Sequence, residues 1–420
     1  MALNPEEFKR QREEKKKQRA EKRRKMAIRL LIAAAVLLVC GLLIFVLLPK
    51  FTAPSSDPQV SSQAATEVTK ETESPFTMVH VVVGGDVNIT DKTVAAGGKT
   101  YDYKNTFIDV AHILADADLA ALNFEGNLFG TPYGTATASA PQQLVEALDS
   151  AGVDLLQLAN SYSINQGIAG LVNTIDGVRA AGMEPLGVYK DEEEYTAGKG
   201  YTIQTVQGIR IAFVAFTKGM DGMALPPGSE NCVNLLYEDY SSTYQTINRE
   251  KITTVLNAAK QERPDVIVAM VHWGSEYNDS VSSSQKSIVS LLQENGVDAV
   301  IGTHSHFVQQ IEYDQEEGTF VAYSIGDFFS DGERAGTQYS VLLDLEITKN
   351  NRNGNVQITG YDLIPIYSYA DPTTGNLRVL RIHDAMDAYE DTFIGCVTEE
   401  VYDDMIYSLT RIEDRISGKG

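Results

Sequence analysis

From residue 77 onward, short apolar runs alternate with segments in which apolar residues recur every three or four positions. The short runs predict buried strands, and the wider spacing predicts helices that cover them. The expected strands are 79–83, 119–123, 153–158, 185–188, 201–206, 209–216, 265–271, 297–301, 320–325, 340–347 and 356–366. The expected helices are 107–117, 141–151, 168–181, 243–261 and 284–294, with a further helical part from about residue 385.

The order of these elements indicates an α/β fold. Strands that alternate with helices predict a sheet of buried, mostly parallel strands. The strands 201–206 and 209–216 flank Gln207-Gly208 and predict a hairpin. The last three strands, from residue 320 onward, follow one another without helices and are expected to be antiparallel.

The first 76 residues have a different pattern. Residues 30–48 are an apolar run without a charge, long enough to cross a bilayer core of roughly 30 Å as a helix. The basic residues before it predict a cytoplasmic tail over 1–29 and an extracellular domain after the span. A cleaved signal peptide is the alternative, but the apolar run is long and no small-residue cleavage site is evident. Residues 49–76 are rich in Ser, Thr, Pro and Gln and predict a flexible linker.

This division places the main domain at 77–369 and a C-terminal helical extension at 370–420. Of 35 Lys and Arg residues, 13 lie in the first 50 positions, whereas only 5 of 57 Asp and Glu residues do. The rest of the chain therefore carries 22 basic and 52 acidic residues. Such an excess repels nucleic acid, so we expect no nucleic-acid partner. The basic tail is expected to orient the span and contact anionic lipids. Cys232 and Cys396 are expected to be free or buried thiols.

Polar side chains stand at the ends of six predicted apolar strands. They are Asp86, Asn123, Glu125, Asn160, His272 and His304. Ligands bind at the carboxyl ends of strands in α/β sheets, so these side chains are expected to meet there. Carboxylate, amide and imidazole groups without a G-x-S-x-G nucleophile favour a metal site over a catalytic triad.

Each of these residues also has a structural interpretation. Asp86 could cap a turn after two glycines, and the segment 123–126 could be an ordinary polar turn. A lone buried His272 is more often a hydrogen-bonded core residue than a ligand. The pair His304 and His306 is more specific, since alternate residues of an extended segment point the same way and can approach one cation.

Six segments together resemble the bacterial poly-γ-glutamate capsule-synthesis family, often called CapA-type. They are GGD (84–86), NFEG (123–126), LANSYSINQG (158–167), HWGSEY (272–277), GTHSHFVQ (302–309) and SIGDFF (324–329). The resemblance covers about residues 77 to 330. It implies a calcineurin-like metallophosphatase fold, an α/β/β/α sandwich with a metal centre at one edge of its sheets. By position it implies a metal-binding set of Asp86, Asn123, Glu125, Asn160, His272, His304 and His306.

The chain departs from the family pattern at five positions, one of which is Asn165, where the family usually has an Asp. Where the family has Ala-Asn-Asn-His, this chain has Ser161 for the second Asn and Tyr162 for the His, and Asp327 stands where Asn is usual. Asn88 occupies a position that is usually apolar in the family and could supply a ligand. Tyr162 is a poor proton shuttle at neutral pH because a tyrosine pKa is near 10. We therefore expect a metal site whose turnover is altered.

Two functions fit this pattern. The first is a role in poly-γ-glutamate or capsule polymer biosynthesis or export, beside membrane components of a synthase complex. The resemblance implies this role, and the polymer would be reached through metal or a local basic groove. The alternative is an extracytoplasmic metal-dependent hydrolase acting on a phosphoester, ester or amide. Both need a divalent ion such as Mn, Zn, Fe or Mg, in one or two copies.

Overall fold

The computed structural model describes residues 74–371, 376–391 and 397–419. The predicted tail 1–29, the apolar run 30–48 and the linker up to residue 73 lie outside these ranges. Among the helices within them, none is both long and apolar enough to cross a bilayer. The first strand begins at Phe76, the last residue of the expected linker.

The first sheet has eight strands and contains both parallel and antiparallel pairs. Strand β1 pairs in parallel with β2, which is followed by β3 and β4, and on its other side β1 pairs antiparallel with β12. A short strand, β11, adds to the end of β1. The bounds are β1 (Phe76–Asn88), β2 (Leu119–Glu125), β3 (Leu155–Gln157), β4 (Glu184–Leu186), β11 (Asp327–Phe329), β12 (Tyr339–Asn350), β13 (Val356–Ala370) and β14 (Leu377–Arg381).

The second sheet has six strands in the order β5-β6-β7-β8-β10-β9. Its inner strands β6, β7, β8 and β10 are parallel, and the antiparallel strands β5 and β9 form its edges. The predicted hairpin is β5 with β6. The bounds are β5 (Tyr201–Val206), β6 (Ile209–Thr217), β7 (Val266–His272), β8 (Ala299–Thr303), β9 (Ile311–Asp314) and β10 (Thr319–Ala322).

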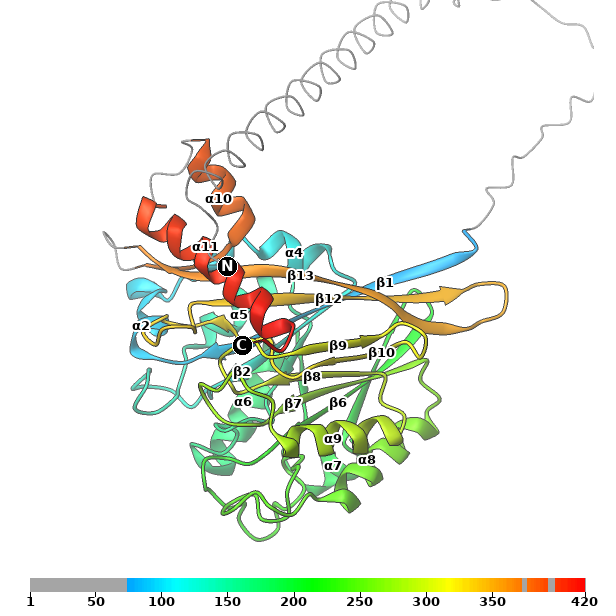
Figure 1. The fold of residues 1–420 in the computed structure, drawn as a ribbon. Coiled ribbons are helices and arrows are strands. Elements are labelled where there is room, and N and C mark those ends of the chain that lie inside the picture. Colours follow the sequence, from blue (N-terminus) through cyan, green and yellow to red (C-terminus); the bar gives the residue numbers. More distant parts are fainter. Residues whose placement is uncertain (1–73, 372–375, 392–396, 420) are drawn as a thin grey trace, which may run out of the picture. The chain divides into compact units, whose positions relative to one another are not determined.

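Helices cover the outer face of each sheet (Figure 1). The first sheet is covered by α2 (Asp91–Ala95), the 3₁₀ turn η2 (Gly98–Thr100), α3 (Lys104–Phe107), α4 (Ala111–Asp116), α5 (Gln142–Ser150) and α6 (Gly167–Ala181). The second is covered by α8 (Arg249–Gln261) and α9 (Ser283–Glu294), and α7 (Glu192–Gly198) precedes β5. This is the expected α/β/β/α sandwich.

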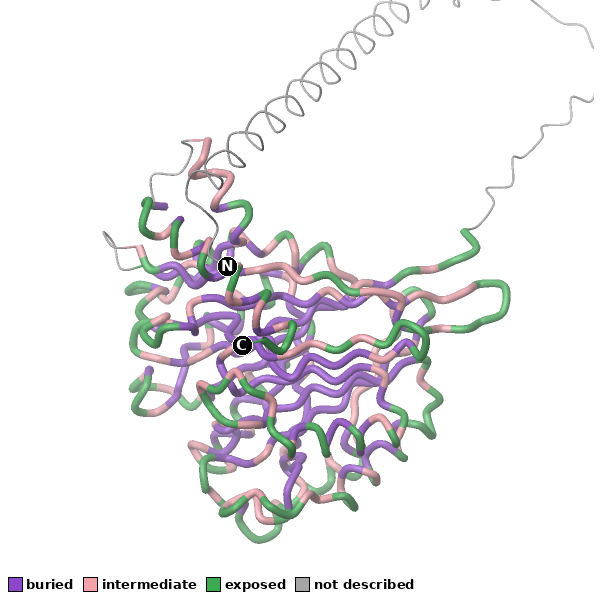
Figure 2. Tube along the Cα trace, in the orientation of Figure 1, coloured by how far each residue is buried: buried purple, intermediate pink, exposed green. Residues whose placement is uncertain are grey.

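Three apolar cores hold these layers together. Val81 and Val83 of β1 face the second sheet and pack in one core with Val268 of β7, whereas Val82 faces the helices with Leu144 and Ile175. A third core joins the second sheet to α8 and α9. Buried residues therefore run along the strands, while exposed ones lie in the outer loops and helix faces (Figure 2). Burial on both faces explains why the strands read as continuous apolar runs.

Three predicted elements differ from the structure. The helix expected over 243–261 begins only at Arg249, because the Asp239 carboxylate accepts the backbone N–H groups of Gln245 and Thr246 and holds a turn there. The helix expected over 107–117 is divided into α3 and α4. Strand β10 lies in the second sheet, parallel to β8, and is not part of an antiparallel series with β12 and β13.

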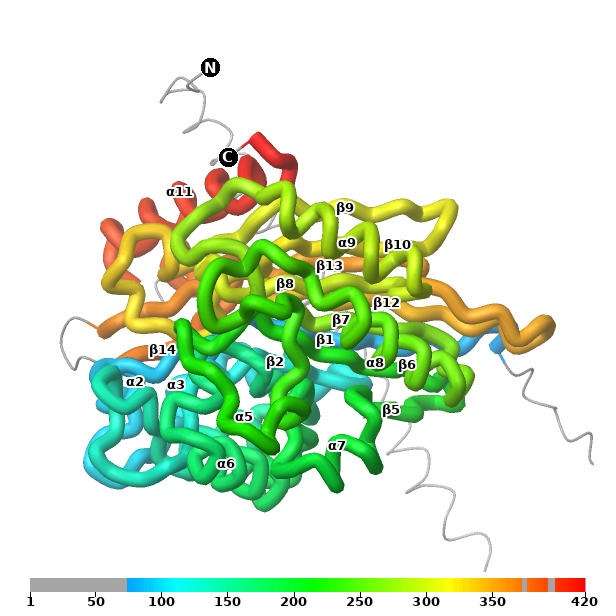
Figure 3. Tube along the Cα trace, turned by 90° about the horizontal axis from the view of Figure 1, so that it is seen from below, coloured from blue at the N-terminus to red at the C-terminus, as the bar shows by residue number. Residues whose placement is uncertain are grey.

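The C-terminal part is more than a helical extension. Strand β14 lies beyond the expected boundary at residue 369 and pairs with β13, so the first sheet continues past it. Two helices follow, α10 (Ile382–Glu390) and α11 (Glu399–Ile416). Seen from below, α11 and α6 lie on opposite sides of the molecule (Figure 3).

Candidate metal centre

The first sheet brings three acidic residues to the end of β1. In the strand register Asp86 is the partner of both Asn123 and Asp327, and Asn88 is the partner of Glu125. The glycine before Asp86 is required by close packing, since a Cβ at Gly85 would lie 1.7 Å from the carbonyl oxygen of Gly326. The GGD segment therefore places Asp86 against β11 and β2.

The second sheet supplies three histidines at the carboxyl ends of β7 and β8. His272 is the last residue of β7, and His304 and His306 follow β8 directly. Both of the latter have positive φ angles, 85° and 59°. Residues other than glycine seldom adopt this backbone, and such strain is concentrated at functional sites.

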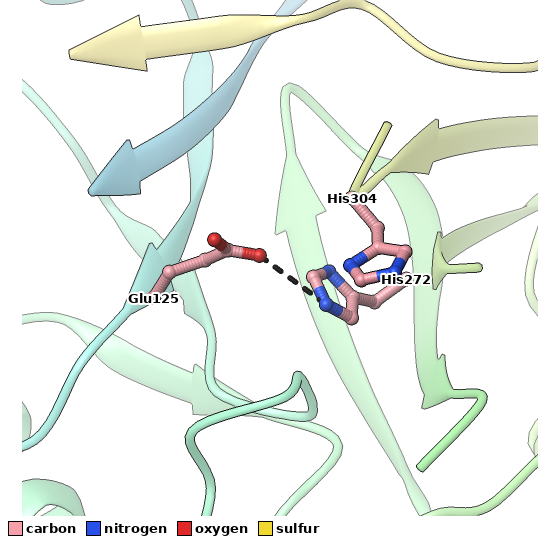
Figure 4. A group of neighbouring side chains, drawn as sticks. All are labelled: Glu125, His272 and His304. Atoms are coloured by element: carbon pink, nitrogen blue, oxygen red, sulfur yellow. Dashed lines mark ion pairs between the residues drawn. The ribbon is translucent and has the colours of Figure 1, made fainter. Parts of the chain in front are cut away.

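Glu125, His272 and His304 form the first of two groups that could hold a metal ion (Figure 4). One ligand atom from each lies within 4.8 Å of the others, and all three residues are buried. Oε1 of Glu125 is 3.2 Å from Nε2 of His272, and the centres of the His272 and His304 rings are 4.4 Å apart. Apart from this contact with His272, Glu125 Oε1 makes no hydrogen bond, and His304 Nε2 has no hydrogen-bond partner, which is costly for buried polar atoms unless they bind a cation.

Asp86, His306 and Asp327 form the second group, again with ligand atoms within 4.8 Å of one another. Nδ1 of His306 lies 2.8 Å from Oδ1 of Asp327 and 3.7 Å from Oδ2 of Asp86. The backbone N–H of His304 donates to Asp86 at 3.0 Å, which connects the two groups. The side chain of Asn88 hydrogen-bonds to Asp327.

Amide and hydroxyl side chains orient these ligands. Asn123 donates to Oδ1 of Asp86 at 2.6 Å and accepts at 3.1 Å from Asn160, which also donates to the Phe124 carbonyl. The Ser161 hydroxyl lies 3.2 Å from Nε2 of His272. Asn123 and Asn160 therefore hold the carboxylates in position, and Ser161 lies beside a candidate ligand atom.

Burial sets the protonation of both groups. It raises the pKa of Asp86 to about 7 and that of Glu125 well above its usual range. Burial also lowers the pKa values of His272 and His304, so both are neutral, the form in which imidazole binds metals. Burial alone would lower the pKa of His306 too, but the Asp327 carboxylate outweighs it and raises that pKa well above its usual range.

Tyr162 stands where the family pattern has a histidine. Its backbone N–H donates to Oδ1 of Asn160 at 3.0 Å, and the Glu125 charge acts on its phenol. Burial, the largest cause, and Glu125 both raise the pKa of Tyr162. The phenol therefore keeps its proton at neutral pH and can donate a hydrogen bond, but it does not exchange protons readily.

These residues fit a divalent metal. The unpartnered Glu125 and His304 atoms converge with His272 from another strand, and the mixture of oxygen and nitrogen donors suits Mn, Fe or Zn. A second ion would be held by Asp86, His306 and Asp327.

The structure brings all seven predicted metal-site residues to one place, with Asn88, Ser161, Tyr162 and Asp327 around them. Their roles as ligands remain a prediction. Two residues at this place were not predicted: Tyr277, whose ring stacks on His306 at 5.0 Å, and Lys218, whose backbone N–H donates to the His272 carbonyl at 2.8 Å. Lys218 directly follows the buried strand β6, so the strand-end criterion that selected His272 could also have selected it.

Helix α11 supports the loops that carry the histidines. The side chain of Arg415 is 5% exposed, and its guanidinium lies 3.4 Å from Asp279 and 4.3 Å from the centre of the Phe307 ring. Phe307 follows His306 and contacts Tyr277 edge-on. Gln309 donates to the carbonyls of residues 278 and 280, which links the same two loops.

A separate cavity of about 290 Å³ lies beside α4 and β14. It is lined by Ile108, Asp109, His112, Arg378, Leu380, Arg381, Asp384, Ala385 and Val397. Its arginines are paired, Arg378 with Asp109 and Arg381 with Asp384. None of the candidate metal residues lines this cavity.

Residues 80–332 match the family described as "Bacterial capsule synthesis protein PGA_cap". The capsule biosynthesis protein CapA of Bacillus anthracis is 26% identical over 219 residues, 50% of this chain and 48% of that protein. The PGA biosynthesis protein CapA of Bacillus subtilis (strain 168) is 25% identical over 226 residues, 53% and 54% of the two chains. The chain thus spans about half the length of both relatives. A solved structure described as a novel phosphatase from Mycoplasma pneumoniae gives a TM-score of 0.41 at 13% identity, covering 70% of this chain and 94% of that one.

Proposed function

Because the chain belongs to the bacterial capsule synthesis protein PGA_cap family, we propose that it takes part in making or exporting a capsule polymer such as poly-γ-glutamate. The curated relatives are described as capsule and PGA biosynthesis proteins. The proposed role is metal-dependent binding of the polymer, without cleavage, beside membrane synthase subunits. The observation that carries it is the pair of buried metal-binding groups, one of which has two unpartnered ligand atoms, on Glu125 and His304.

The presence of Tyr162 favours binding of the polymer over its rapid hydrolysis. Rapid cleavage needs a group that gives a proton to the leaving atom and regains it near neutral pH. Burial keeps the proton on the phenol of Tyr162. Tyr162 replaces the histidine that is expected to act as the acid in the family. The two candidate groups keep most of the metal-binding residues that the family pattern implies, with Ser161 in place of one Asn, whereas the residue expected to transfer the proton is replaced.

A slower metal-dependent hydrolase is the second candidate. The neutral His272 and His304 and the acidic Glu125 form a site in which a divalent ion would polarise a phosphoryl or carbonyl oxygen and lower the pKa of a bound water. Asn123 and Asn160 would keep the carboxylates in place during such a reaction. This candidate requires the same metal but adds turnover.

The two candidates are distinguished by metal content and turnover of the purified full-length chain. We would measure bound metal and the hydrolysis of a chromogenic phosphoester with added Mn²⁺, for the wild type and His304→Ala. His383→Ala is the control, since His383 is an exposed histidine outside the metal-binding groups. If the wild type retains metal but does not hydrolyse the phosphoester, the result supports the polymer-binding role. If hydrolysis is present and is lost only in His304→Ala, the result supports the hydrolase. A wild-type chain that binds no divalent metal would refute both.

The proposed location is the outer face of a cell membrane, with residues 30–48 as the span and 1–29 in the cytoplasm. The apolar length of this run and the basic residues before it support the proposal. Protease added to intact cells should digest the large domain and spare the tail. Digestion of the tail with a protected domain would reverse the topology.

A further inference from the structure

Lys218 is a half-buried cation at the rim of the first metal-binding group. Its ammonium donates to the Gly274 carbonyl at 3.0 Å and lies 5.3 Å from the centre of the Tyr244 ring. In the described part of the chain no carboxylate lies within 4.0 Å of it. A partly buried lysine usually has such a partner, so its charge is available to a ligand.

The charge of Lys218 acts on the candidate metal ligands. It lowers the pKa values of both His272 and His304, and the Glu125 carboxylate acts on Lys218 in turn. Glu276 and Asp221 also influence it, from beyond ion-pair distance. Two hydrogen bonds hold Lys218 beside the first group, from its backbone N–H to the His272 carbonyl at 2.8 Å and from its ammonium to the Gly274 carbonyl at 3.0 Å.

Arg334 is a second cation, placed at the other group. Its guanidinium carbon lies 3.6 Å from the centre of the Tyr277 ring, and that ring stacks on His306. Arg334 is exposed and, within the residues that the structure describes, makes no ion pair. Stacking on an aromatic ring fixes the guanidinium while leaving its N–H groups free to donate.

Lys218 and Arg334 lie in a domain whose overall charge is strongly negative. After residue 50 the chain carries 22 basic and 52 acidic residues, so its long-range field repels anions. Other arginines at the surface, such as Arg179 and Arg378, are paired with carboxylates. Lys218 and Arg334 are therefore two cations without carboxylate partners that lie beside the two metal-binding groups of an acidic domain.

We infer that Lys218 and Arg334 form an oxyanion-binding pair that selects a ligand with phosphoryl or carboxylate oxygens at the metal centre. This inference rests on the proposed metal-dependent function and names its ligand class. The guanidinium of Arg334 presents parallel donors that suit a two-oxygen anion, and Lys218 supplies a compact positive charge. The pair lets an acidic domain accept an anionic ligand at this one position.

The test compares anion binding among matched variants of the full-length chain. Calorimetric titrations would use Mn²⁺ alone, then inorganic phosphate or glutarate on the Mn²⁺-loaded chain. The variants are Lys218→Met and Arg334→Gln. The controls are Lys349→Met and Arg352→Gln. Lys349 also donates to a backbone carbonyl, that of Gly208 at 2.8 Å, but lies opposite Thr77 at the far end of β1.

Each variant in the pair is expected to weaken anion binding at least tenfold while Mn²⁺ affinity changes less than about threefold, with both controls unchanged. Tighter binding of phosphate assigns a phosphoryl ligand, and tighter binding of glutarate assigns a carboxylate ligand. Anion affinity that is absent in the wild type, or unchanged in both variants, overturns the inference. If Mn²⁺ does not bind, the proposed function fails. The anion affinities of the metal-free wild type, Lys218→Met and Arg334→Gln are then compared in the same way to test whether Lys218 and Arg334 bind an anion.

Discussion

Nδ1 of His306 lies 2.8 Å from Oδ1 of Asp327, and the imidazole carries a proton at neutral pH because that carboxylate raises its pKa. The protonated ring places a positive charge between Asp327 and Asp86. A divalent ion bound by these three residues would have to displace this proton. Metal binding and proton release are therefore coupled in this group.

Replacing Asp86 is expected to change how stability depends on pH. Burial raises its pKa from 3.8 to about 7, so between these values the folded chain holds a proton that the unfolded chain has lost. The stabilisation is complete below pH 4 and is lost as pH rises to 7, by up to about 4 kcal/mol. In Asp86→Asn this loss should be absent. Urea unfolding with chelator at pH 4 and pH 8 measures it; equal pH dependence in both proteins would contradict the expectation.

Glu125→Gln is expected to have opposite effects on stability and on metal binding. The buried carboxylate is unfavourable when ionised, as its raised pKa indicates, so the neutral amide should stabilise the metal-free chain at pH 8 by about 1–3 kcal/mol. Loss of a ligand charge should weaken Mn²⁺ binding by about 100-fold or more. Unfolding with chelator and a metal titration give the two values. Glu146→Gln, which changes an exposed carboxylate on α5 away from the metal-binding groups, is the control.

Tyr162→His is expected to raise metal-dependent phosphoester hydrolysis by at least about tenfold, because imidazole exchanges protons near neutral pH. Tyr162→Phe keeps the ring and removes only the hydroxyl, so Mn²⁺ affinity should stay within about twofold. The measurement is kcat/KM for a chromogenic phosphoester with Mn²⁺. If the wild type turns over and Tyr162→Phe does not, Tyr162 itself donates the proton.

Arg415→Met is expected to destabilise the chain by about 2 kcal/mol and to weaken Mn²⁺ binding severalfold. The substitution leaves Asp279 without its most buried partner and removes the guanidinium from the Phe307 ring. Metal binding should suffer because Phe307 adjoins His306. Arg411→Gln is the matched variant, since Arg411 also contacts Asp279 but its side chain is 28% exposed, and its loss should cost less than about 1 kcal/mol. Equal effects of the two substitutions would show that α11 is not a specific support.

The position of the candidate site at strand ends could be predicted from sequence, because strands buried on both faces read as apolar runs whose ends are easy to locate. Runs such as 79–83 and 265–271 are apolar on both faces, which indicates parallel strands between covering layers. Parallel strands of one sheet end at the same edge, so the polar residue after each run was expected at such an edge. Asp86 and His272 meet because the two sheets pack with these ends together, which the apolar runs do not indicate. The two-sheet layering was implied by the family resemblance and not by the apolar runs, and Cys232 is a buried free thiol as expected. Cys396 lies outside the described residues.

Other features depend on contacts between distant residues. Strand β11 is only three residues long and forms because Asp327 pairs with Asp86, which no local pattern indicates. The turn before α8 forms because side-chain bonds of Asp239 replace helical ones. The left-handed backbone of His304 and His306 is also imposed by the surrounding fold, since neither residue favours it alone.

Each metal-binding group takes its members from both sheets. Glu125 and Asp86 belong to the first sheet, and His272 and His306 come from strands of the second or the loop after them. An ion in either group would cross-link the sandwich at this end, whereas the far end near Thr77 is joined by packing and by hydrogen bonds such as that from Lys349 to the Gly208 carbonyl. A small slide of one layer over the other would therefore loosen the ion's hold.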